Sequence, residues 1–94
     1  MIYIVTYTLA DVQRRNYDGL YTVLRSSFDA WMHYVNDSWF IATNQHMTAE
    51  AVYNLLAPHI QNDCSVIVIR VMHDYFGNLP NDAWDWLEQH ASYY

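Results

Sequence analysis

Lysine is absent from this chain, and glycine, proline and cysteine are scarce. The 94 residues include two glycines, two prolines and one cysteine. Four arginines face ten carboxylates, which gives a formal net charge of -6. Because an acidic surface repels polyanions and four arginines are too few to line a duplex groove, we expect no binding to duplex nucleic acid. Two glycines also leave little material for a glycine-rich phosphate loop.

Long apolar runs and paired cysteines are missing as well. The lone Cys64 cannot form an internal disulfide, which favours a reduced thiol and an intracellular, cytoplasmic location. No stretch approaches the ~18 to 20 apolar residues of a membrane span. The first residues lack the basic region and cleavage site of a signal peptide. We therefore expect a soluble protein with no membrane contact.

Apolar and aromatic residues, in contrast, are abundant. The hydrophobic fraction is 53% and the charged fraction 15%, whereas globular chains average about 45–50% and about 25%. A chain of this length forms one domain, residues 1–94, and a domain this small leaves much apolar surface uncovered. That excess predicts a homodimer or higher homo-oligomer.

The pattern of apolar residues predicts an order of strands and helices. We expect strands over 2–7, 31–35, 39–43 and 65–72. Three helices should begin near Asn16 or Asp18, with Thr48 as an N-cap, and with Asn81 as an N-cap, and Pro58 should end or kink the second helix. The continuous apolar run 66–69 is typical of a central strand covered on both faces. This order predicts an α+β, ferredoxin-like βαββαβ domain with a four-stranded antiparallel sheet and a short C-terminal helix. Its second sheet face requires cover from that helix, from another subunit, or from both.

Three aspartates lie near predicted strand ends, where carboxylates can converge on Mg²⁺ or act as acid and base: Asp11, Asp63 and Asp74. The alternative is that they cap loops and carry surface charge. The five histidines lie thirteen or more residues apart, so the sequence predicts no zinc site. We expect no catalytic centre, no cofactor and no metal, with Mg²⁺ as the alternative.

The aromatic residues suggest a binding surface, because rings stack on bases and a nearby arginine can hold a phosphate. An alternative is that they pack a dimer interface, where tyrosine, tryptophan and arginine are enriched. The predicted ligand contacts are Tyr7, Arg14, Arg15, Trp31, His33 and Trp39.

Several short aromatic or polar segments follow one another in a characteristic order along the chain. They are Ile2 to Tyr7, Trp31-Met32-His33-Tyr34 with Ser38-Trp39, Asn62-Asp63, and Leu79-Pro80 with Ala83-Trp84 and Trp86-Leu87. Over nearly the whole chain they resemble the small SinR-like proteins, which are related to VapD toxins and to the second CRISPR-associated adaptation protein. The resemblance implies a dimer across the sheet and, for some relatives, a metal-dependent ribonuclease. Nuclease members carry an aspartate after the tyrosine that ends the first strand, whereas Thr8 follows Tyr7 here.

Three functions remain open at this point. The first is a noncatalytic homodimer that binds a small nucleotide-like ligand or a protein partner, such as a phage-encoded counter-defence protein that sequesters a nucleotide signal. The second is a metal-dependent endoribonuclease that uses Asp11 with Asp63 or Asp74. The third is a structural subunit whose aromatic surface docks on a larger protein complex.

Overall fold

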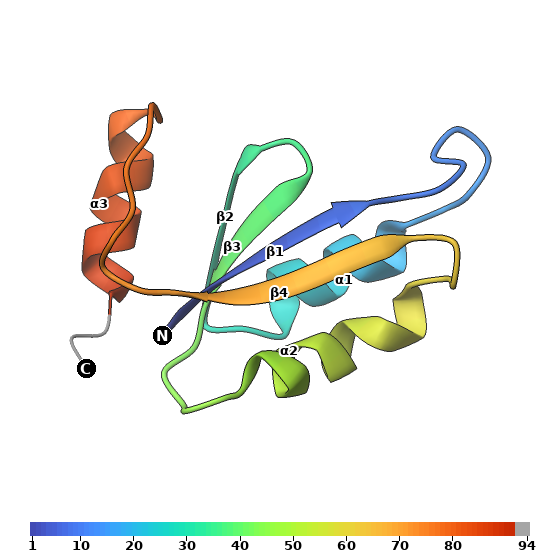
Figure 1. The fold of residues 1–94 in the computed structure, drawn as a ribbon, viewed down its shortest axis with the longest axis horizontal. Coiled ribbons are helices and arrows are strands. Elements are labelled where there is room, and N and C mark those ends of the chain that lie inside the picture. The colour runs from blue at the N-terminus through green and yellow to red at the C-terminus, as the bar shows by residue number, and fades with distance from the viewer. Residues whose placement is uncertain (92–94) are drawn as a thin grey trace.

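The computed structural model describes residues 1–91 of the chain (Figure 1). The elements in chain order are β1 (Ile2–Thr8), α1 (Asp18–Ser26), β2 (Ala30–Val35), β3 (Ser38–Ala42), α2 (Ala49–Leu56), β4 (Ser65–Val71) and α3 (Asn81–His90). A short 3-10 helix that contains Pro58, Ala57–His59, follows directly after α2.

The four strands form one antiparallel sheet in the order β2-β3-β1-β4. β1 lies between β3 and β4, with Val5 opposite both Trp39 and Val68. The predicted α+β, ferredoxin-like architecture with an added C-terminal helix is therefore confirmed. No helix within residues 1–91 has the length and apolar character needed to cross a bilayer.

Helices α1 and α2 pack on one face of the sheet. Each places two buried aliphatic residues there, four positions apart: Leu20 and Leu24 on α1, and Val52 and Leu56 on α2. They meet the inward side chains of β1, among them Tyr3 and Val5. The predicted cap of α2 is confirmed, because the Thr48 hydroxyl accepts a hydrogen bond from the Ala51 N–H at 3.0 Å.

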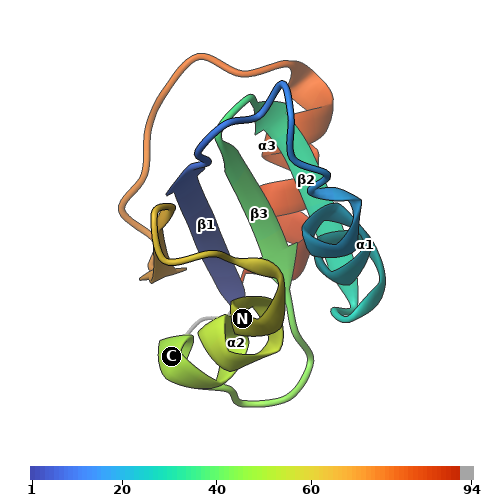
Figure 2. The same cartoon turned by 90° about the vertical axis from the view of Figure 1, so that its right-hand side faces the viewer.

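Helix α3 covers only part of the opposite face. Figure 2 shows it behind β2 and β3, on the far side from α1 and α2. Ala83 and Leu87 of α3 pack there against Ile2, Met32 and Ala42. The prediction that Asn81 caps this helix is wrong: Asn81 is its first residue, and the preceding Pro80 supplies no side-chain acceptor.

The predicted central position of β4 is also wrong. β4 is an edge strand, and on the α3 side of the sheet its Ile67 and Ile69 are 54% and 48% exposed. They lie opposite Thr6 and Ile4 of β1. Apolar residues on both faces of a strand indicate that both faces are suited to burial, but not which molecule buries them. In β4 the face with Val66 and Val68 packs against the core, and the face with Ile67 and Ile69 does not. The β1–β4 half of this face therefore stays open.

Candidate functional site

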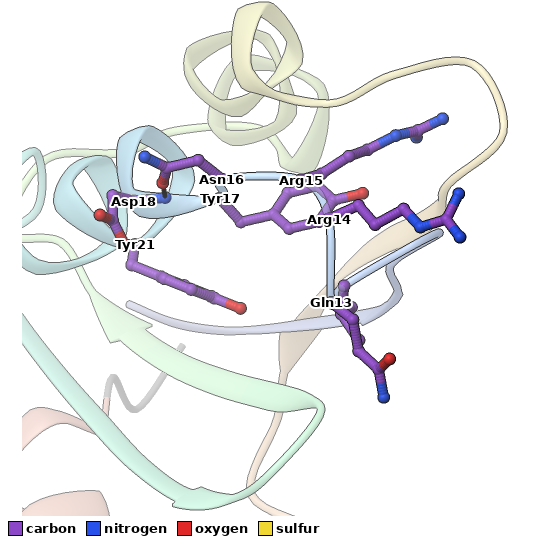
Figure 3. A pocket seen from close by; sticks show the side chains of 8 residues that line it. Gln13, Arg14, Arg15, Asn16, Tyr17, Asp18 and Tyr21 are labelled. Carbon is purple, nitrogen blue, oxygen red and sulfur yellow. Dashed lines mark hydrogen bonds between the residues drawn. The ribbon is translucent and has the colours of Figure 1, made fainter.

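The loop between β1 and α1 turns sharply at Asp11. The backbone of Asp11 is left-handed, with φ of 54°, a conformation that aspartate tolerates better than most residues. Its carbonyl accepts hydrogen bonds from the N–H groups of Arg14 and Arg15, both at 3.0 Å. This turn sends the two arginine side chains out on the same side of the loop (Figure 3).

The two neighbouring arginines differ in what they contact. Arg15 forms a bidentate ion pair with Asp63, which precedes β4, at 2.6 and 2.7 Å. Hydrogen bonding from Arg15 holds the pKa of Asp63 below its ordinary value. Arg14 is exposed and has no ion-pair partner among residues 1–91. Arg14 therefore carries the free positive charge of this loop.

Tyr17 and Cys64 form the inner side of the loop. The buried Tyr17 hydroxyl donates a hydrogen bond to the Ala10 carbonyl and lies 3.4 Å from Cys64 Sγ. The Ala10 N–H also donates to Cys64 Sγ, at 3.4 Å. Burial raises the pKa of the Cys64 thiol, but hydrogen bonds from Ala10 and Tyr17 favour the thiolate and bring the net pKa below its ordinary value.

An open pocket with a cavity volume of about 410 Å³ lies beside this loop (Figure 3). Its lining includes two tyrosine rings, four positions apart in the sequence, and two arginines. Its lining residues are Val12, Gln13, Arg14, Arg15, Asn16, Tyr17, Asp18 and Tyr21. We refer to it as the loop pocket.

A stack of rings leads from the loop pocket toward β2. The buried Trp39 ring lies between Tyr21, with centroids 6.1 Å apart, and His33, at 4.0 Å. Trp31 lies tilted against the same indole at 5.3 Å. Trp39 Nε1 donates a hydrogen bond to the Tyr7 hydroxyl at 2.9 Å, and burial raises the pKa of Tyr7 above its ordinary value.

The six predicted ligand contacts thus divide into three groups. Arg14 and Arg15 line the loop pocket. Tyr7 and Trp39 are buried in the core. Trp31 and His33 lie outside the loop pocket, at the free edge of β2. For all six residues, contact with a ligand remains a prediction.

Sequence reasoning did not select Tyr17 and Tyr21 as site residues, although they supply the two rings of the loop pocket. The available signal was their spacing. Residues i and i+4 at the start of a helix share one face, and these two lie two and six positions after Arg15. That spacing next to a pair of arginines indicates one common surface.

The three candidate aspartates do not gather. Because β1 and β4 are antiparallel, Asp11 and Asp63 lie beyond the end where Thr8 faces Ser65, while Asp74 follows the other end of β4. Within the described part of the chain, no three histidine, cysteine, aspartate or glutamate side chains are placed to hold a metal ion together. Asp63 is moreover engaged by Arg15.

The comparisons with known proteins identify no relative: the chain matches no family model, no curated protein and no solved structure. The resemblance to SinR-like proteins therefore stays a prediction.

Proposed function

We propose that this chain is a noncatalytic homodimeric protein that binds a small nucleotide-like ligand in the loop pocket. The observation that carries this proposal is the unpaired Arg14 in a pocket that the rings of Tyr17 and Tyr21 also line. A nucleotide combines an anionic phosphate with a flat aromatic base. Arginine donates charge-assisted hydrogen bonds to phosphate, and tyrosine stacks on a base.

The size and charge of the pocket favour a small ligand over a polymer. A cavity volume of about 410 Å³ is close to the lower end of the ~300 to 1,000 Å³ of known ligand sites. Arg14 is the one arginine of the loop pocket without an ion pair in the described chain, and it can hold a single phosphate. The net charge of -6 repels a longer polyanion. We infer that a single phosphate of the ligand contacts the pocket.

Arg15 has a different role in this proposal. Its ion pair with Asp63 joins the loop to the start of β4, so its charge is largely neutralised. A bidentate pair fixes geometry more than it contributes to stability at an exposed site. Arg15 thus positions the loop, and Arg14 contacts the phosphate.

Thermal unfolding against a panel of mononucleotides and dinucleotides tests the ligand. A bound ligand at about 100 times its dissociation constant stabilises the fold by ~2.7 kcal/mol, which raises the melting temperature. We expect Arg14→Ala to remove this shift and Arg25→Ala, a matched change on the last turn of α1, to retain it. Equal shifts in both variants, or no shift with any nucleotide, would exclude the loop pocket as the site.

The homodimer is supported by the open half of the sheet. Ile4, Ile67 and Ile69 form an uncharged patch, and the outer edge of β4 has no neighbouring strand within residues 1–91. Long apolar edge strands invite pairing with another chain. In an isologous dimer the same patch of both subunits is in contact, so the patch must be complementary to itself. An uncharged apolar patch meets this requirement, because no charge is buried without a partner.

A further inference from the structure

A second hollow lies between β2 and α3, apart from the loop pocket. Its cavity volume is about 470 Å³. Because β2 is an edge strand, side chains from both of its faces reach this hollow around the free edge. Its lining residues are Trp31, Met32, His33, Tyr34, Asp82 and Trp86.

Rings dominate the walls of this hollow. Trp31 and Tyr34 are 43% and 48% exposed, Trp86 is half-buried, and the buried Met32 closes the inner side. The contact between α3 and the sheet is already made by Ala83 and Leu87. Trp86 also packs on this cluster, and Trp31 packs on Trp39, yet Trp31 and Tyr34 keep nearly half of their surface exposed. Exposed apolar clusters of this kind mark binding sites.

The hollow also contains one uncompensated negative charge. Asp82, in the first turn of α3, is exposed and has no ion-pair partner among residues 1–91. None of the four arginines lines the hollow, and the chain has no lysine. Two further titratable side chains line the hollow, Tyr34 and His33. The Nε2–H of His33 donates to the Asn36 carbonyl at 2.9 Å.

We propose that this hollow binds a small organic cation of the methylated ammonium class, such as a choline-like compound. A cation over the faces of tryptophan and tyrosine is attracted by the ring quadrupole, and quaternary ammonium groups are recognised by aromatic cages. Asp82 supplies the opposite charge.

The walls favour a methylated ammonium over a bare one. A primary ammonium has three N–H donors that each require an acceptor, and leaving them unsatisfied is costly. The hollow offers indole and phenol rings and a single carboxylate. A quaternary ammonium has no N–H donors to satisfy, so its entry costs only the desolvation of its charge, which Asp82 and the rings offset.

Titration with choline, followed by the indole N–H resonances of the four tryptophans, tests the proposal. We expect choline to shift the resonances of Trp31 and Trp86. The uncharged analogue with a quaternary carbon in place of the nitrogen has the same shape, and we expect it to bind at least about tenfold more weakly. No shift with choline up to about 10 mM, or equal binding of the two compounds, overturns the proposal.

Matched variants locate the site. We expect Trp86→Ala to abolish the shift of Trp31, and Asp82→Asn to weaken choline binding by about three- to tenfold through the loss of one charge. Asp85→Asn removes an exposed carboxylate of the same helix that does not line the hollow, and should leave binding unchanged. If Trp86→Ala does not fold, the choline affinities of Asp82→Asn and Asp85→Asn provide the test. Equal affinities of these two variants contradict the proposal.

Discussion

Arg14 and Arg15 are adjacent and chemically identical, yet their surroundings give them different roles. Arg15 is held by Asp63, and Arg14 has no ion-pair partner in the described chain. Sequence reasoning selected both as phosphate contacts but had no means to separate them, because the partner of Arg15 lies 48 positions away. Only the pairing of β1 with β4 brings Asp63 to the loop. Local sequence therefore indicated the two arginines, whereas their different pairing could not be predicted from it.

Cys64 gives a prediction about pH. The Ala10 N–H donates to its sulfur, and the Tyr17 hydroxyl, whose one proton otherwise goes to the Ala10 carbonyl, can turn to the thiolate 3.4 Å away. The pKa of Cys64 therefore lies below the ordinary value despite burial. Removing a donor to the thiolate raises the pKa, and we expect Tyr17→Phe to move the midpoint of Cys64 alkylation to higher pH. The measurement is the rate of reaction with iodoacetamide against pH, which reports a single site because the chain has one cysteine. A midpoint that is unchanged or lower in Tyr17→Phe would contradict this account of the thiol.

The helices and strands themselves were predicted from local patterns, whereas the position of β4 in the sheet was not. Thr48 caps α2, and Pro58 follows its end, as the sequence indicates. The apolar run of β4 led to the wrong prediction of a central strand. Sequence alone cannot distinguish a strand buried by its own chain from one that another molecule covers, because both show apolar residues on each face.

The cap of α2 provides a direct test at this scale. We expect Thr48→Ala to lower the free energy of unfolding by ~1 kcal/mol, because the Ala51 N–H loses its acceptor. Thr48→Ser keeps the hydroxyl and serves as the control, with a change of only a few tenths, about 0.3 kcal/mol. Urea denaturation measures both values. A loss of equal size in the two variants would show that the methyl group of Thr48, and not its hydroxyl, stabilises the helix.

For the molecule as a whole, the exposed apolar half of the sheet and the surplus of aromatic residues point in the same direction. Helices α1 and α2 cover most of one face and α3 covers part of the other, which leaves Ile67 and Ile69 in water when the chain is alone. The sequence predicted an excess of apolar surface from composition. It did not predict the position of that surface, because the coverage of α3 depends on the path of segment 72–80 from β4 (Figure 1).

The proposed dimer is tested by a charge placed on that surface. We expect the wild-type protein to sediment as a dimer at micromolar concentration, and Ile69→Glu to sediment as a folded monomer because the carboxylate would be buried without a partner. Leu55→Glu is the matched control, since Leu55 is 43% exposed on α2, on the other side of the sheet, and its substitution should retain the dimer. A wild-type monomer would contradict the dimer and favour docking of this face on a larger protein complex.

The central claim is that the loop pocket holds a nucleotide-like ligand, and mapping of backbone amide shifts tests it most directly. A nucleoside monophosphate titrated into the ¹⁵N-labelled protein should shift the amides of residues 12–21, with the largest changes beside Arg14 and Tyr21. Amides of β4 beyond Ser65 should remain in place, since that strand lies outside the pocket. Changes that avoid residues 12–21, or none at millimolar ligand, would contradict the account.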